Sequence, residues 1–332
     1  MKNSKRLVDP ELAPMLDGFG DVTYTRENIQ QSRQAMSVAN GQNVEDHYAV
    51  TVREEYIDSI FEDNKIRIII ISPKETHDGK QPLLFSIHGG GMVMGSPEMD
   101  SEFHAFMAQN YNFIGVSVEY RLSPEVIQPA LLHDNYSAIK WCVDHAEELN
   151  IDKEKIAISG DSAGGGLAGG LALYIMDKGE FEIQLVLLRI PMLDDRTGAK
   201  PDHPVNGEFV WNHASNKFGW ESALGKPAGS EDVSPYYSPA RAESTAKLPP
   251  VYMCVGSLGL FADETLDFAK KLMHDGVPVE LHVYPGYFHG GIAVTSAYYA
   301  RQEFDNRLHA LLKNLKIEDT GKKHEAVATG FL

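Results

Sequence analysis

Apolar stretches alternate with polar turns and amphipathic stretches along most of the chain, a pattern that predicts alternating strands and helices. Eight apolar stretches predict strands, at 48–55, 66–71, 83–88, 113–120, 156–159, 183–190, 251–255 and 279–284. Apolar residues recur at helical spacing between them, for example over 130–148. We therefore predict an α/β fold with an eight-stranded, mostly parallel sheet and helices on both faces.

Three segments interrupt or flank this pattern. Residues 1–45 mix polar and apolar positions with several Pro and Gly, and about 195–240 has only weak periodicity, with aromatic residues scattered among polar ones. We predict that both segments form a cap, the second as an insertion in a catalytic domain over 46–316. Residues 317–332 lack an apolar period and predict a loose tail.

The ten residues at 156–165 have the pattern of a strand that turns sharply into a helix. Gly160, Ser162 and Gly164 form G-x-S-x-G, and a run rich in Ala, Gly and Leu extends to about Met176. In this context the serine sits in a strained turn with its hydroxyl exposed, and the helix directs free N–H groups toward it. We predict that Ser162 is a nucleophile. The alternative is a chance match to a short pattern.

A glycine loop follows the third predicted strand, in the sequence His88-Gly89-Gly90-Gly91. Without Cβ atoms, the N–H groups of Gly89 and Gly90 can approach a substrate oxygen and form an oxyanion hole with the N–H of Ala163. A flexible loop is an alternative interpretation. A phosphate loop is another, although no G-K-[ST] follows.

Among thirteen histidines, His289 has the best position for a general base. It follows the last predicted strand, and a loop there can bring its imidazole over the end of the strand that carries Ser162. We predict that His88 shapes the glycine loop. No histidine spacing forms a metal motif with a nearby carboxylate, so we predict no metal site.

Composition limits the class of protein. The chain has 332 residues with a net charge of −17, which disfavours nucleic acid and anionic membranes as partners. Cys142 and Cys254 are the only cysteines, too few for a disulfide scaffold. No apolar run reaches the roughly 20 residues needed to span a membrane, and we see no signal peptide, so we expect a cytoplasmic location. The oligomeric state is open, with a homodimer as one option.

The motifs together resemble the hormone-sensitive-lipase-like esterases, bacterial lipolytic family IV, of the α/β-hydrolase fold. The resemblance covers roughly residues 45–315 and rests on four segments: His88–Gly91, Glu119–Glu125, Gly160–Gly165 and Tyr284–His289. It implies a cap from the N-terminal segment and the insertion, and hydrolysis of short to medium acyl esters without a cofactor. It also implies Ser162 as nucleophile, His289 as base, and oxyanion donors at Gly89, Gly90 and Ala163.

One position departs from the family pattern. After the seventh strand that pattern is G-x-x-D-x-L-x-D-E, whose first aspartate orients the histidine, but this chain has Gly259 there. Such an acid fixes the imidazole tautomer and stabilises the imidazolium. Asp263, about one helical turn further on, is our tentative substitute, and Asp194 after the sixth strand is a second. Each also has a purely structural interpretation: Asp263 as a charge in the first turn of a helix, and Asp194 as a loop residue.

The leading hypothesis is a carboxylesterase that acts on a small-molecule ester through an acyl-enzyme. Because of Gly259, a catalytically weak or silent ligand-binding protein on the same scaffold is the chief rival. An amide or lactone hydrolase is a third hypothesis, because a fold does not fix the substrate.

Overall fold

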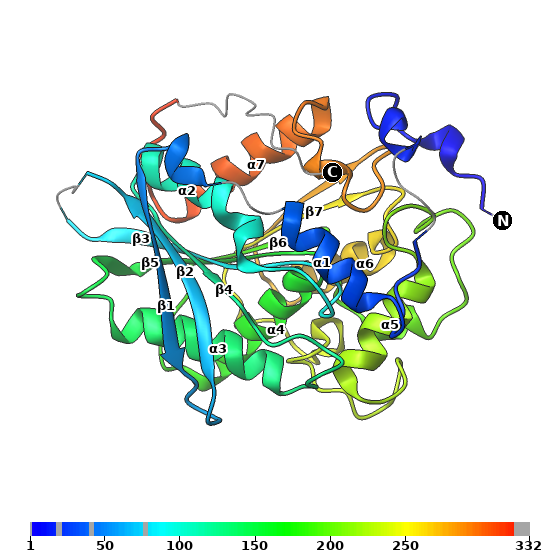
Figure 1. Cartoon of the computed structure of the whole chain (residues 1–332), viewed down its shortest axis with the longest axis horizontal. Coiled ribbons are helices and arrows are strands. Elements are labelled where there is room, and N and C mark those ends of the chain that lie inside the picture. The colour runs from blue at the N-terminus through cyan, green and yellow to red at the C-terminus, as the bar shows by residue number, and fades with distance from the viewer. Residues whose placement is uncertain (1, 18–21, 40–42, 76–78, 322–332) are drawn as a thin grey trace.

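A single eight-stranded sheet runs through the protein (Figure 1). The computed structural model describes residues 2–17, 22–39, 43–75 and 79–321. In sheet order the strands are β1 (Val50–Asp58), β2 (Lys65–Pro73), β4 (Ile114–Val118), β3 (Gln81–Ile87), β5 (Ile151–Asp161), β6 (Leu185–Arg189), β7 (Val251–Gly256) and β8 (Val279–Tyr284). Strand β2 is antiparallel to β1 and β4, and every other neighbouring pair is parallel. The predicted eight-stranded, mostly parallel sheet is confirmed.

Helices cover both faces of the sheet. They are α1 (Ile29–Ala39), α2 (Ser101–Tyr111), α3 (Ala130–Asp144), α4 (Ala163–Lys178), α5 (His213–Leu224), α6 (Ala262–His274) and α7 (Tyr298–Asn314). Helices α3, α4 and α6 share one apolar core with alternate residues of β3, such as Phe85. Helices α2 and α7 share a second core with the opposite face, including Leu84. Because successive side chains of a strand point to opposite faces, one continuously apolar strand feeds both cores.

Short 3₁₀ turns complete the described structure, at Lys5–Leu7, Ala13–Asp17, Val44–Asp46, Pro97–Asp100, Asp195–Gly198, Pro239–Arg241 and Gly291–Ala293. The N-terminal segment contacts the stretch after β6 at several points. The Tyr24 N–H donates to Ser215 Oγ at 3.0 Å, and the Asn212 amide donates to the Thr23 hydroxyl at 2.9 Å. Segments nearly two hundred residues apart in sequence therefore lie side by side.

Two differences from the sequence prediction have simple causes. Strand β5 begins at Ile151, five residues before the predicted start, because Ile151 pairs with Gln81 across an irregularity that precedes the regular β3–β5 ladder. Helix α5 lies within the weakly periodic 195–240 stretch. It buries small and polar residues such as Ser215, Asn216 and Gly219, so it lacks the apolar stripe that marks a helix in sequence.

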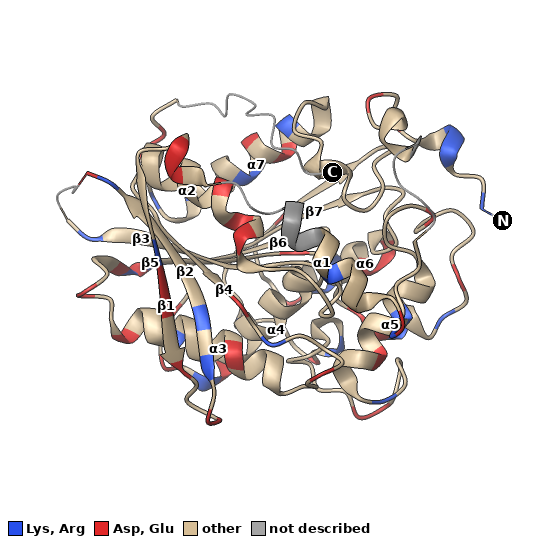
Figure 2. Ribbon diagram, viewed as in Figure 1, with Lys and Arg blue, Asp and Glu red and all other residues tan. Residues whose placement is uncertain are grey.

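The carboxyl ends of β3, β5, β6, β7 and β8 lie along one edge of the sheet, where α/β folds place their ligands. Acidic residues are spread over strand β1 and over helices such as α2, α3 and α6 (Figure 2). Within the described residues, no helix is both long enough and apolar enough to cross a membrane. The predicted tail at 317–332 falls largely outside the described residues.

Candidate active site

Ser162 stands at the sharp turn between β5 and α4. Its backbone has φ 56° and ψ −117°, a conformation that costs a non-glycine residue about 1–3 kcal/mol. Surrounding backbone holds it: Ser162 N–H donates to the Arg189 carbonyl, and the Met192 N–H donates to the Ser162 carbonyl, both at 2.8 Å. Hydrogen bonds to the last residue of β6 and to the chain just after it therefore hold Ser162 in this strained conformation.

The glycines of this turn permit close backbone contact. A Cβ on Gly160 would lie 2.1 Å from the Gly164 carbonyl oxygen, and one on Gly164 would lie 1.9 Å from that of Ile87. Real Cβ atoms do not approach so closely, so the turn requires glycine at both positions. The second contact also sets the distance between the turn and the end of β3.

The turn and the loop after β8 bring Ser162 and His289 together. Ser162 Oγ lies 2.9 Å from His289 Nε2, and both residues are buried, with 8% and 7% of their surface exposed. Burial lowers the pKa of His289 to about 4, because a buried imidazole is poorly solvated when charged. At neutral pH the ring is therefore uncharged and can accept a proton from the serine.

The glycine loop after β3 lies against the serine. A Cβ on Gly89 would lie 3.4 Å from Ser162 Cβ. Among the described residues, the N–H groups of Gly89, Gly90 and Ala163 donate to no hydrogen-bond acceptor. Free amides beside a serine hydroxyl are what an oxyanion hole requires.

His88 shapes this loop, as its position suggested. Its Nδ1 lies 2.8 Å from the Gly89 carbonyl, and its ring stacks on Tyr120 with centroids 4.2 Å apart. The Tyr120 hydroxyl in turn donates to the His88 carbonyl at 3.0 Å. The His88 side chain therefore holds the backbone of the glycine loop in place. Burial also lowers the pKa of His88 to about 4.

A buried ionic group behind the serine turn escaped the sequence analysis. Arg189, at the end of β6, contacts Asp161 at 2.5 Å and Glu303 of α7 at 2.9 Å. Glu303 is buried and Arg189 is largely so, and removing either would leave the other with one remaining partner, Asp161 for Arg189 and Arg307 for Glu303. The available signal was that Arg189 is the one charged residue of the predicted strand at 183–190, whose other residues are apolar except Gln184.

Gly259 follows β7 and lies beside the histidine. A Cβ built on it would be 3.8 Å from the His289 backbone nitrogen. The register assigned from the family pattern thus brings position 259 to the histidine. Within the described part of the chain, His289 makes no hydrogen bond or ion pair with a carboxylate.

The structure does not bring the tentative acid, Asp263, to His289. The Asp263 carboxylate is 73% exposed and lies 4.0 Å from His203 Nε2. Although Asp263 is only four residues beyond Gly259, it lies in the first turn of α6 with its side chain exposed to solvent. The spacing of Gly259 and Asp263 in the sequence does not show which way the Asp263 side chain points.

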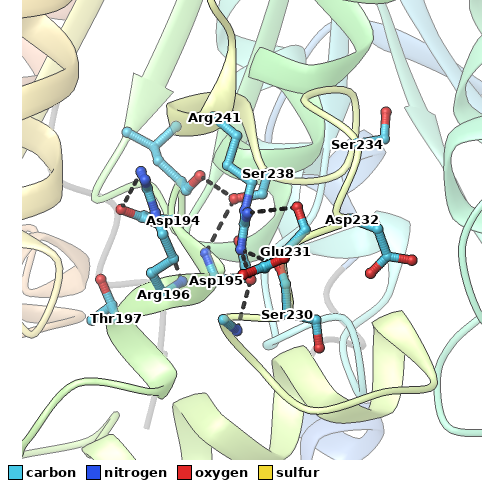
Figure 3. A network of polar contacts seen from close by, with 12 residues as sticks. Asp194, Asp195, Arg196, Thr197, Ser230, Glu231, Asp232, Ser234, Ser238 and Arg241 are labelled. Carbon is cyan, nitrogen blue, oxygen red and sulfur yellow. Dashed lines mark hydrogen bonds and ion pairs between the residues drawn. The ribbon is translucent and has the colours of Figure 1, made fainter.

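Asp194 is also engaged elsewhere (Figure 3). Its carboxylate accepts from the Arg196 N–H at 3.0 Å and from Arg196 Nε at 2.7 Å. The adjacent Asp195 is bound by both ends of the Arg241 guanidinium, at 2.6 and 2.8 Å. Both aspartates therefore organise the stretch after β6, and neither contacts the histidine.

Comparison with known proteins decides the family. A family model described as alpha/beta hydrolase fold matches residues 84–293. The chain belongs to this family. It is 29% identical over 310 residues to "Esterase LipI" of Mycobacterium tuberculosis, covering 92% of this chain and 94% of the relative. An "Arylesterase" of Saccharolobus solfataricus is 28% identical over 277 residues, covering 82% of this chain and 88% of the relative.

Solved structures agree with these relatives. The chain is similar to "Bacterial Heroin Esterase", with a TM-score of 0.87, 32% identity and coverage of 94% of this chain and 99% of that one. The expected membership among hormone-sensitive-lipase-like esterases is confirmed. The family and its named relatives assign the chain to the carboxylic ester hydrolases of the α/β-hydrolase family.

Proposed function

We propose that this hydrolase cleaves short to medium acyl esters through a covalent acyl-enzyme on Ser162. The observation that carries the proposal is the 2.9 Å contact between Ser162 Oγ and His289 Nε2. An uncharged imidazole at this distance can take the serine proton as Oγ attacks the ester carbonyl. The amides of Gly89, Gly90 and Ala163 would then donate to the oxyanion.

The reaction completes with the same groups. The imidazolium returns its proton to the leaving alkoxide, which departs as the alcohol and leaves an acyl group on Ser162. Water then attacks this acyl group while His289 takes its proton, and the acid is released with the serine restored. The scheme needs no metal and no cofactor.

An organophosphonate tests the nucleophile. We expect a single adduct on Ser162, located by mass spectrometry of the digested protein, and loss of p-nitrophenyl ester hydrolysis in step with labelling. Ser162→Ala should take up no label. Labelling at another serine, with Ser162 unmodified, would contradict the mechanism.

We further propose that residues 1–45 and about 195–240 form a cap that limits acyl length. The stretch 195–240 places Trp211 over the glycine loop, since a Cβ on Gly91 would lie 2.0 Å from the Trp211 ring. Tyr24 of the N-terminal segment packs on the same ring, with centroids 5.6 Å apart. A bulky indole over the oxyanion loop restricts the adjoining pocket.

Acyl preference follows from this cap. Across p-nitrophenyl esters from C2 to C16, we expect kcat/KM to be highest for short acyl chains and to fall for longer ones. Trp211→Ala should move the optimum to longer chains, because it removes the ring from the loop. A maximum at C12 or longer in the unmodified protein would show that the cap does not limit length.

A weak or silent hydrolase is the second candidate, and one observation favours it. Within the described residues, His289 has no carboxylate partner, and loss of that partner cost about 10⁴ in rate in a well-studied serine protease. Turnover of a p-nitrophenyl ester, as opposed to binding without turnover, separates the two candidates.

A further inference from the structure

Arg189 holds the serine turn through two separate groups. Its carbonyl oxygen accepts a hydrogen bond from the Ser162 N–H at 2.8 Å, and its guanidinium Nη1 contacts the Asp161 carboxylate at 2.5 Å. Asp161 and Arg189 are also the last pair in the register of β5 and β6. The nucleophile and the residue before it are therefore both tied to one residue of β6.

Glu303 of α7 fixes the Arg189 guanidinium. Its buried carboxylate accepts from Arg189 Nε at 2.9 Å and from Nη2 at 3.2 Å. Arg307, one turn further along α7, lies 3.7 Å from the same carboxylate, and its guanidinium lies 3.6 Å from the centroid of the Phe103 ring. A planar guanidinium bound at two nitrogens by one carboxylate has little freedom to turn. Helix α7 therefore sets the direction in which Nη1 faces Asp161.

The backbone of Asp161 also lies against the glycine loop. A Cβ built on Gly89 would be 3.0 Å from the Asp161 carbonyl oxygen and 3.4 Å from Ser162 Cβ. A shift of Asp161 would therefore change two distances of the proposed reaction at once. One is the distance from Ser162 Oγ to His289, and the other is the distance from the Gly89 amide to the oxyanion.

Ser162 needs support on both sides because its backbone is strained, with φ 56°. A strained residue keeps its conformation only where its surroundings over-determine it. On the helix side of the turn, the Met192 N–H donates to the Ser162 carbonyl at 2.8 Å. On the strand side, the Arg189 carbonyl and the Arg189–Asp161 ion pair hold the turn.

We propose that Arg189 is a positioning residue for the nucleophile. Its ion pair with Asp161 keeps Ser162 Oγ and the Gly89 amide at the distances that attack requires. This inference rests on the function proposed above. Within the described residues, no hydrogen bond or ion pair joins the Arg189 side chain to Ser162 or His289, so Arg189 acts through the backbone of the turn. Small displacements of reacting groups can cost about 100-fold in rate.

Asp161→Ala tests the ion pair and leaves Arg189 paired with Glu303. With p-nitrophenyl butyrate as substrate, we expect kcat to fall by about ten- to 100-fold. We expect KM to stay within about twofold, because the defect lies in placing the reacting atoms and not in binding the ester. Asp161→Glu should recover most of kcat. The Asp161 side chain is 29% exposed, so a longer acid has solvent beside it and still brings a carboxylate to the guanidinium.

Arg67 provides a matched control away from the site. It also bridges two carboxylates, contacting Glu54 at 2.8 Å and Glu98 at 2.7 Å, and 15% of its side chain is exposed, compared with 12% for Arg189. It lies on β2, which β4 and β3 separate from β5. Glu54→Ala leaves Arg67 one carboxylate, as Asp161→Ala does for Arg189, and we expect it to leave kcat unchanged. An equal loss of kcat in the two variants would overturn the proposal.

Hydrogen exchange reads the same ion pair without any ester. In Asp161→Ala we expect the Ser162 N–H to exchange faster than in the unmodified protein. The Val251 N–H, which donates to the Pro278 carbonyl at 2.9 Å in the same sheet, should exchange at an unchanged rate. Equal acceleration of both amides would overturn the proposal, because the ion pair would then stabilise the whole fold and not the turn.

These two readouts keep the test distinct from that of the proposed function. Absence of turnover and of phosphonate labelling in the unmodified protein would contradict the proposed function alone. If Asp161→Ala keeps kcat within about twofold and the exchange rate of the Ser162 N–H is unchanged, the role of Arg189 alone is overturned.

Arg189→Lys provides a second variant in case Asp161→Ala does not fold. Lysine keeps the positive charge but lacks the planar fork that engages Asp161 and Glu303 together. We therefore expect kcat to fall by about tenfold with little change in KM. Full kcat in a folded Arg189→Lys protein would overturn the proposal.

Discussion

The serine end of the site and the acid end, on opposite sides of His289, differ in how they are held. At the serine end, backbone hydrogen bonds hold Ser162, and a methyl group added to Gly160 or Gly164 would collide with neighbouring backbone. At the acid end, a Cβ on Gly259 would meet one close neighbour, the Gly256 carbonyl oxygen at 3.2 Å, and its next contacts are at 3.8 and 3.9 Å. The first region tolerates almost no added atom, whereas the second would take a Cβ if its neighbour moved by a few tenths of an ångström.

This difference separates two requirements of a serine hydrolase. The position of the nucleophile depends on strain and close packing, which one substitution can destroy. The acid contributes charge and orientation to a base that is already in contact with the serine, so its absence need not disturb the fold. A chain can thus keep the geometry of attack after losing part of its transition-state stabilisation.

Supplying the acid should have the largest effect on activity. We expect Gly259→Asp to raise kcat for a p-nitrophenyl ester with little change in KM, because the added carboxylate acts on the developing imidazolium. If no other acid serves, the gain approaches about 10³–10⁴. Steady-state kinetics measures it, after a thermal melt has shown that the variant is folded.

The same kinetics can show that position 259 has been misassigned. Asp263→Asn and Asp194→Asn are the matched controls, since both carboxylates lie away from His289. A folded Gly259→Asp protein with unchanged or lower kcat, together with full activity in both controls, would place the acid elsewhere.

One chemical change made at both ends sharpens the comparison. Gly164→Ala would put a methyl 1.9 Å from the Ile87 carbonyl oxygen, and such overpacking typically costs about 1–3 kcal/mol. Gly259→Ala meets its nearest atom at 3.2 Å and also reduces unfolded-state entropy, so we expect a change in unfolding free energy within about 1 kcal/mol. Urea denaturation compares the two. Equal destabilisation would mean that the acid end is packed as tightly as the serine end.

The sequence predicted the serine end of the site better than the acid end. Glycine spacing around Ser162 and after β3 reflects backbone contacts that few other residues allow, so the pattern carries geometric information. The direction of Asp263 and the pairing of Asp194 with Arg196 depend on tertiary placement, which sequence distance does not encode. The spacing of apolar residues also did not predict that β4 lies between β2 and β3 in the sheet. Nor did it predict helix α5, which has no apolar stripe.

The smallest expected effect is a shift in pH dependence. Burial lowers the pKa of His289 to about 4, and the base must be uncharged to accept the serine proton. In the unmodified protein, kcat/KM should therefore be retained at pH 7 and lost as pH falls through about 4.

An adjacent carboxylate favours the imidazolium and raises the pKa of His289, by about 1–3 in typical ion pairs. The acid limb of Gly259→Asp should then lie at higher pH, so its advantage over the unmodified protein should shrink between pH 7 and pH 5. A pH–rate profile of both proteins measures the shift. Coincident acid limbs would mean that the new carboxylate does not contact His289, whatever its effect on kcat.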